Sequence, residues 1–244
     1  MSFTEGPMFR IRILAALLVL WGVCGVSAAE YEGFQTIGVT ALKPFARDLG
    51  GLLGSGSNQT ARSLGFSGFD VGVRTAAQLK PSHNNTALKK NSVFGFGVVQ
   101  AEIGMPYRID GFVRGGSYEG LTVAGGGLRY GLWNISDAKY KINAMLVVMA
   151  NMATHRYFYA LHINSSLVCS MNMPVVSPYL GAGFDSTRLE AQAVASPAAG
   201  MGVSVLEPRF TAGLRVKLDL GYLSAGATYT HDSLLFNAST GIRF

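Results

Sequence analysis

The sequence predicts an all-β protein, a closed antiparallel transmembrane β-barrel of about ten strands that follows a short N-terminal helix. Three observations predict this class: successive segments alternate apolar with small or polar residues, an export signal begins the chain, and charged residues are scarce. Charged residues make up 14% of the 244 positions, and glycine occupies 31 of them. An ordinary soluble domain has roughly 25% charged residues. The 20 basic residues form no stripe of the kind that nucleic-acid binding requires, so nucleic acid is not an expected partner.

The N-terminal residues have the pattern of a secretory signal peptide. Arg10 and Arg12 precede an apolar run over residues 13–26, and small residues follow it. The run is shorter than the roughly 20 residues that a membrane-spanning helix requires. We therefore predict export and cleavage after Ala28 or Ala29.

Period-two alternation is the main structural signal in the rest of the chain. It is clearest in the last three segments and weakest in the third. In the second segment the apolar positions change phase between Val98 and Val99, which predicts a β-bulge. The expected strands are residues 69–78, 94–103, 109–115, 127–132, 140–151, 157–164, 180–185, 209–217, 223–230 and 234–244.

The composition of the two strand faces distinguishes a membrane barrel from a soluble one. The less apolar face is mostly Gly, Ser, Ala and Asn with single charges, whereas a soluble strand presents Lys, Glu and Thr to water. The apolar face has aromatic residues near segment ends, as interfacial girdles do: Tyr157, Tyr159, Tyr229 and Phe244. Backbone groups in hydrocarbon must all be paired, so the strands must close on themselves. We expect the apolar face to contact lipid and the other face to enclose a narrow lumen.

The lengths of the links indicate an orientation. If Phe244 and the mature N-terminus face the periplasm, the long links at residues 80–92 and 189–208 lie on the outer side. The compact links at residues 105–108 and 134–139 then lie in the periplasm. Short periplasmic turns and longer outer loops are typical of this class.

Three segments are expected: a signal peptide (1–29), an N-terminal segment (30–67) and the barrel (68–244). Apolar residues in the middle segment recur at helical spacing, with Thr40 as a suitable cap and Pro44 in the first turn. These apolar residues are Leu42, Phe45, Leu49 and Leu52. The helix either lies against the periplasmic rim or folds into the lumen as a plug, and the sequence does not decide between the two.

With these features the chain resembles Gram-negative outer-membrane β-barrel proteins over most of residues 30–244. Phe244 is similar to the terminal aromatic that the barrel assembly machinery recognises in that class, which implies that it is an assembly signal. The N-terminal helix and the sequences FSGFDVGV, AGLRVKL, GATYT and GIRF also resemble FadL-like transporters of hydrophobic compounds and their PorV-like relatives. Those proteins are much longer, so no binding residue is carried over from them.

Single charges on the less apolar face are the candidate functional residues. A basic side chain that faced lipid at the midplane would cost about 2–4 kcal/mol, so alternation assigns these charges to the lumen. One interpretation is a network of ion pairs that closes a narrow barrel. The other is a polar constriction whose basic excess favours anions. The residues are Asp70, Arg74, Glu102, Asp110, Arg129, Lys141, Asp185, Arg215 and Lys217.

A hydrolase is the rival class. His231 and Ser233 share a face at the outer end of the ninth strand, where an outer-membrane lipid hydrolase would place a His beside a Ser nucleophile. The same residues are typical of a polar turn. Cys169 would be the single cysteine after signal cleavage, which excludes an internal disulfide. We predict a non-enzymatic protein with no catalytic residue, cofactor or metal.

The predicted function is passive passage or handling of a small solute or lipid by an outer-membrane barrel. A structural barrel without an open pore is the alternative, and a lipid hydrolase is a third. The expected partners are outer-membrane lipid and lipopolysaccharide, the barrel assembly machinery, and a small solute or lipid.

Overall fold

The computed structural model describes residues 31–134, 138–192, 194–195 and 197–244. The predicted signal peptide lies outside the described residues. Two helical segments come first, the 3-10 helix η1 (Tyr31–Thr36) and the α-helix α2 (Val39–Leu53). The strands are β1 (Phe69–Gln78), β2 (Phe94–Gly104), β3 (Ile109–Tyr118), β4 (Leu121–Gly131), β5 (Lys141–His155), β6 (Phe158–Asn172), β7 (Val176–Ala191), β8 (Gly202–Lys217), β9 (Gly221–Thr230) and β10 (Ser233–Arg243), with a 3-10 turn η2 (Pro106–Arg108) between β2 and β3.

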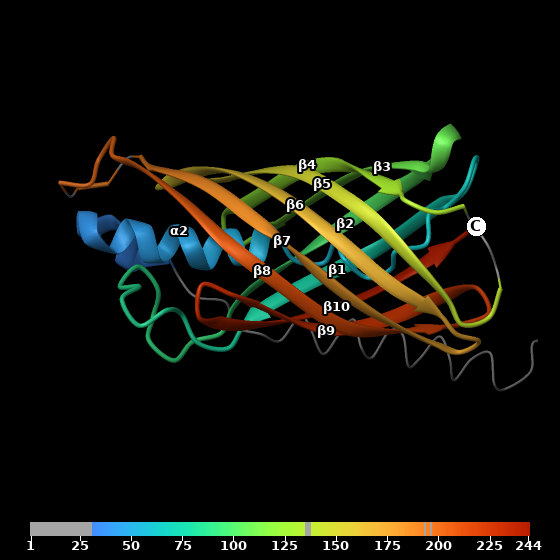
Figure 1. Ribbon diagram of the computed structural model, residues 1–244. Helices are drawn as coiled ribbons and strands as arrows, with labels where there is room; N and C mark the ends of the chain where they lie inside the picture. The colour runs from blue at the N-terminus through green and yellow to red at the C-terminus, as the bar shows by residue number, and fades with distance from the viewer. Residues whose placement is uncertain (1–30, 135–137, 193, 196) are drawn as a thin grey trace, which may run out of the picture.

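The strands form one closed antiparallel barrel (Figure 1). Each strand pairs with its neighbours in sequence, and β1 pairs with β10 from Asp70 opposite Arg243 to Gln78 opposite Leu235. Every strand thereby has a paired neighbour on both sides, which is the condition for strands to lie in hydrocarbon. The predicted fold class is confirmed, including the third strand, where the alternation is weakest.

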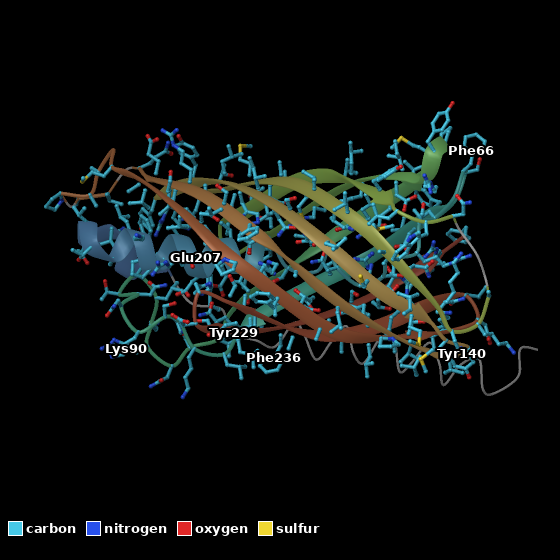
Figure 2. All side chains as sticks on the ribbon, viewed as in Figure 1. Phe66, Lys90, Tyr140, Glu207, Tyr229 and Phe236 are labelled. Atoms are coloured by element: carbon cyan, nitrogen blue, oxygen red, sulfur yellow. The ribbon has the colours of Figure 1, made fainter. Side chains whose placement is uncertain are left out.

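The outer face of the barrel is apolar on every strand. Large apolar side chains such as Val113 are exposed there, and Tyr229 and Phe236 point away from the barrel (Figure 2). Tyr157 does not belong to the predicted aromatic girdle. Its side chain is buried, because it lies in the β5–β6 turn and its hydroxyl accepts a hydrogen bond from Gln35 of η1.

β2 contains no bulge, so the predicted bulge is wrong. β1 and β2 pair without interruption along the whole of β1. The even-numbered residues Phe94, Val98 and Gln100 all face inward and are buried. Val99, between Val98 and Gln100, faces outward and is exposed. The inward side chains of β2 change from apolar to polar along the strand, and this change of composition resembles a change of phase.

The two ends of the barrel differ in their links. The end that holds Phe244, the C-terminal end below, has the links 105–108, 132–140, 173–175 and 218–220. The opposite end, the helix end below, has the longer links 79–93 and 192–201 together with three tight turns. The link 192–201 is shorter than predicted because β7 and β8 continue as a long hairpin beside α2 (Figure 1).

The C-terminal part of α2 lies inside the barrel at the helix end and its N-terminal part lies beside the β7–β8 hairpin (Figure 1); the helix packs mainly against β7 and β8. Its N-cap is Gly38, which makes no side-chain cap hydrogen bond. The predicted Thr40 cap is therefore wrong, and Pro44 lies in the second turn. None of the helices in the described part of the chain is long and apolar enough to cross a membrane.

Residues 55–65, called the strap below, continue from α2 through the lumen to the start of β1. Most of the strap is buried. η1, α2 and the strap are together called the plug (residues 31–65). The lumen of this barrel is therefore occupied by the chain's own N-terminal segment.

Candidate functional site

The half of the lumen at the helix end has an apolar interior. Phe45 and Leu49 on α2 are fully buried among inward side chains of the barrel wall. The ring centroid of Phe45 lies 5.0 Å from the centroids of Phe34 and Phe158, so η1, α2 and β6 share one aromatic cluster. We call the apolar side chains around Phe45 and Leu49 the seat of α2. Burial of apolar area contributes roughly 25 cal/mol per Å², so these contacts hold the helix in the barrel.

Asp48 is a fully buried carboxylate on α2 that joins three other segments. Burial alone raises the pKa of Asp48, but side-chain hydrogen bonds outweigh this and hold its pKa below the ordinary value. The partners are Gln78 at 2.9 Å on β1, Ser82 and Asn85 at 2.5 and 2.6 Å on the β1–β2 link, and His231 Nε2 at 2.9 Å in the β9–β10 turn. Ionised Asp48 therefore fixes the helix to the rim.

Two arginines of the barrel wall hold the C-terminal end of α2. Arg209 on β8 donates from Nη2 to the carbonyl oxygen of Gly51 at 2.6 Å. Arg114 on β3 donates to the carbonyl oxygens of Leu53 and Ser55, the second at 3.0 Å. The last carbonyls of a helix lack partners within it, and cations are favoured at its negative end. The arginines thus satisfy the carbonyls and complement the helix dipole.

Two glycines permit the close approach of α2 to the wall. A Cβ atom at Gly50 would lie 2.2 Å from Thr187 Oγ1 on β7, and one at Gly54 would lie 2.3 Å from Arg209 Nη2. Asp185 of β7 accepts a hydrogen bond from Arg209 Nε at 2.7 Å and so fixes that guanidinium. A larger residue at either position would displace the helix end or the arginine unless the facing side chain is changed as well.

The half of the lumen at the C-terminal end combines a polar network with a small apolar cluster of Ala61, Phe112, Met145, Val147, Met149 and Val168. Arg129 on β4 donates to the carbonyl oxygen of Ser57 in the strap and to Glu102 on β2, both at 2.6 Å. Arg74 on β1 donates to the same Glu102 at 3.1 Å and to Asp70 at 3.2 Å. The strap is therefore bound to a continuous network of paired charges.

The last residues of the strap are held in the same way. The main-chain N–H of Ala61 donates to Ser170 Oγ at 2.9 Å, and Ser63 Oγ donates to Asp110 at 2.7 Å. Arg243 on β10 donates to the carbonyl oxygen of Ser63 at 2.7 Å. Three different strands thus bind the strap within three residues.

The buried charges of the described residues balance in number. Four of the five bases form ion pairs and Arg114 bonds to carbonyl oxygens, an arrangement that differs from a ring of like charge. The buried bases are Arg74, Arg114, Arg129, Arg209 and Arg215, and the buried acids are Asp48, Asp70, Glu102, Asp110 and Asp185.

The predicted lumen charges lie in two places. Lys141 is half-buried and Lys217 is exposed, and both bond to groups at the C-terminal end. The remaining seven are buried in the lumen: Asp70, Arg74, Glu102, Asp110, Arg129, Asp185 and Arg215.

Sequence reasoning missed three residues that hold the helix, although a signal for each was present. Arg114 has the strand parity of Asp110, and Arg209 has the parity of Arg215, so alternation places both inward. Asp48 lies three residues after Phe45 on the apolar face of α2, where an acid requires buried partners.

The predicted hydrolase pair has a different setting. His231 is in the β9–β10 turn, where Nε2 bonds to Asp48 and Nδ1 has no hydrogen-bond partner among the described residues. Ser233 is the first residue of β10. Within the described part of the chain, no group of three or more His, Cys, Asp or Glu side chains could hold a metal ion.

A cavity of about 610 Å³ opens at the C-terminal end, beneath the strap. Its lining combines residues of the strap, the β4–β5, β6–β7 and β8–β9 links, and the ends of β8 and β10. Five of the lining side chains are basic and one is acidic: Arg62, Lys139, Arg215, Lys217 and Arg243, against Asp219.

A closed antiparallel barrel with an apolar outer face defines a class, because such a face is stable only in lipid. The chain is therefore a closed antiparallel transmembrane β-barrel.

No family model matches the sequence, and no curated protein matches it. Among solved structures the chain is similar to Neisserial surface protein A, with 14% identity and a TM-score of 0.31, over 72% of this chain and 95% of that one. It is also similar to Ail, the attachment invasion locus protein of Yersinia pestis, with 12% identity and a TM-score of 0.26, over 73% and 99% of the two chains. Ail in complex with the heparin analogue sucrose octasulfate gives 13% identity and a TM-score of 0.34 over the same shares.

Proposed function

We propose that this protein is a plugged barrel that handles a small solute and lets it pass only when α2 leaves its seat. The observation that carries the proposal is the occupation of the lumen by residues 31–65, with a cavity left at the C-terminal end. A passively open pore is less well supported, because both arginines at the end of α2 and the charges around the strap close the lumen from wall to wall.

The attachment of the plug favours a gate over a purely structural filling. No covalent bond other than the main chain at residue 66 joins the described plug to the wall, since Cys169 is a free cysteine on β6. The helix is held by apolar burial and by hydrogen bonds at Asp48 and at its C-terminal end, which are contacts that can open and close as a unit. A permanently structural barrel remains the second candidate, and it is favoured by the number of buried ion pairs.

We propose a non-enzymatic role as well. His231 supports this, since its Nε2 is engaged with Asp48 of the plug and is not directed to a serine hydroxyl. A deacylation assay with phospholipid and lipid A is the check. Turnover that His231→Ala and Ser233→Ala both abolish, with the barrel still folded, would favour the hydrolase instead.

We also propose how the protein is exported and inserted into the membrane. Residues 1–29 would direct export, and Phe244 would be read by the barrel assembly machinery. The exposure of the Phe244 side chain supports a role in recognition, and its main-chain N–H pairs with the carbonyl oxygen of Phe69 at 2.8 Å. Phe244→Ala should then lower the amount of folded barrel in the outer membrane without changing the stability of the purified protein.

Conductance in planar bilayers tests the gate. We expect no steady open-channel current from the unaltered protein. Leu49→Asp places a charge in the apolar seat of α2 and should produce currents, whereas Val39→Asp, on the exposed start of the same helix, should not.

A reversible lock sharpens this experiment. Gly50→Cys with Thr187→Cys, combined with Leu49→Asp and Cys169→Ala, should suppress the currents when oxidised and restore them on reduction. A steady current from the unaltered protein would contradict closure of the lumen by the plug. A folded Leu49→Asp variant that never conducts would establish the structural barrel.

A further inference from the structure

The cavity at the C-terminal end has a strongly uneven charge. Apart from Arg215, which belongs to the balanced set of buried lumen charges, its side chains comprise four bases and one acid, an excess of three positive charges. A concave site lined by one sign of charge focuses the electrostatic potential and concentrates counter-ions. The cavity volume of about 610 Å³ lies within the range of roughly 300–1,000 Å³ that is usual for small-molecule sites.

The bases reach the cavity from separate elements of the fold. Arg215 is held in place on the wall, because its guanidinium carbon lies 3.6 Å from the centroid of the Tyr222 ring and its nearest acid, Asp70, is 3.9 Å away. Lys217 Nζ donates to two neutral oxygens, Asn172 Oδ1 at 2.5 Å and the Met173 carbonyl at 2.8 Å. These contacts orient the ammonium group at the cavity.

A buried hydroxyl beside these bases also lacks a partner. Ser177 lines the cavity, lies opposite Arg215 in the β7–β8 pairing, and is 6% exposed. Its Oγ makes no hydrogen bond to any other described residue. A buried polar atom without a partner costs about 1–3 kcal/mol, a cost that a bound acceptor would relieve.

We propose that this cavity binds a small multivalent organic anion, either a polycarboxylate or an organic phosphate. Guanidinium groups match both oxyanions in geometry, and several cations around one site favour a ligand with more than one negative charge. Leu64, Met173 and Leu218 supply apolar surface for the carbon skeleton. The site deepens the proposed function, since the anion is the solute that approaches the plug from the C-terminal end, but binding here does not require the plug to move.

Calorimetric titration of the folded barrel in uncharged detergent tests the site. Citrate and glucose 6-phosphate are the two anionic probes, and glucose is the neutral control. We expect saturable binding of at least one anion, weakened by salt, and no binding of glucose. The two anions separate the carboxylate and phosphate sources. Failure of both anions to bind, or equal binding of glucose, would overturn the proposal.

Matched variants locate the binding. Lys139→Gln with Lys217→Gln removes two charges at the cavity and should weaken anion binding about tenfold, equivalent to about 1.4 kcal/mol. Lys89→Gln with Lys90→Gln removes two exposed charges at the helix end, where Lys90 is labelled in Figure 2, and should leave the affinity unchanged. Equal weakening by both pairs would show non-specific attraction to the net charge and would contradict the site.

A third variant distinguishes the site from a general charge effect. Ser177→Ala keeps every charge and should still weaken binding several-fold, with unchanged migration of the unheated barrel as the check of folding. Unchanged affinity in this variant would remove Ser177 from the site. The oxidised Gly50→Cys/Thr187→Cys protein should bind the anion with normal affinity, so that loss of binding and loss of gating are measured separately.

Discussion

The two halves of the lumen are filled by different chemistry. At the helix end, α2 is enclosed by apolar side chains such as Phe94 and Phe158, as in the core of a soluble protein. At the C-terminal end, the extended strap is bound mainly by arginines and carboxylates such as Arg129 and Glu102, and its Ala61 packs in a small apolar cluster with β3, β5 and β6. The same strands supply both linings, and β2 changes from apolar to polar along its inner face.

The difference follows from what each part of the plug can satisfy by itself. An α-helix pairs its own backbone groups except at its ends, so its wall can be apolar, with polar partners needed only at its C-terminal carbonyls. An extended segment pairs none of its own, so the wall must supply donors and acceptors. The lining of a filled barrel is therefore set by the secondary structure of what fills it.

The largest effect is expected from Glu102→Ala in the polar half. This change leaves Arg74 and Arg129 buried without their shared carboxylate, and removal of one partner of a buried ion pair costs about 3–5 kcal/mol. Urea unfolding followed by the fluorescence of Trp133 measures it. Glu119→Gln, at an exposed turn, should change the unfolding free energy by less than about 0.5 kcal/mol. A Glu102→Ala variant as stable as this control would show that the network does not support the barrel.

A smaller and more local effect is expected from Phe45→Ala in the apolar half. Loss of a buried Phe side chain costs roughly 3 kcal/mol, and here the cost falls on the docking of α2. Proteolysis within residues 39–53 should accelerate while the urea midpoint of the barrel stays constant, and Val39→Ala should change neither. A fall of the barrel midpoint as large as that of Glu102→Ala would show that the two halves are not separable.

The smallest effect concerns pH and Asp48, which links the apolar half to the rim. Its pKa is lowered in the folded protein, so its contribution is complete above the pKa of an unfolded Asp, about 4, and is lost as the pH falls through the lower folded value. Docking of α2 should therefore weaken only in acid. Asp48→Asn should be weaker than the unaltered protein at pH 7 and should lose part of the acid dependence. Identical acid profiles for the two proteins would exclude Asp48 as the titrating group.

Alternation predicted the strands because the lipid-facing side is uniform, while the inner side varies. The phase change read at Val98 and Val99 was wrong for this reason: Phe94 and Val98 belong to the apolar cluster that includes α2, where Phe94 contacts Phe45, and no feature of β2 itself reveals that neighbour. Single charges such as Glu102 could be assigned inward by the cost of placing them in lipid. The position of the plug could not be predicted, because an amphipathic helix fits a rim and an apolar lumen equally well.

The contacts of Arg114 and Arg209 with the end of α2 could not be predicted from the sequence either. Strand parity places Arg114 and Arg209 inward, but only the folded barrel brings these residues, from strands distant in sequence, to the carbonyls of Gly51 and Leu53. The cavity at the C-terminal end likewise gathers bases from the strap, one link and two strands. Sites assembled from such distant segments leave no local sequence pattern.

Formation of a disulfide between α2 and β7 tests the central claim, that the chain's own N-terminal segment fills the lumen. In a protein with Gly50→Cys, Thr187→Cys and Cys169→Ala, a Cβ at position 50 lies 3.1 Å from the Cβ of residue 187, close enough to cross-link with a small adjustment. If the plug fills the lumen, mild oxidation of the folded protein in membranes should link residues 50 and 187 in most molecules, as measured by mass spectrometry of unreduced peptides. A folded barrel in which that link does not form would place the helix outside the lumen and contradict the filling of the barrel by residues 31–65.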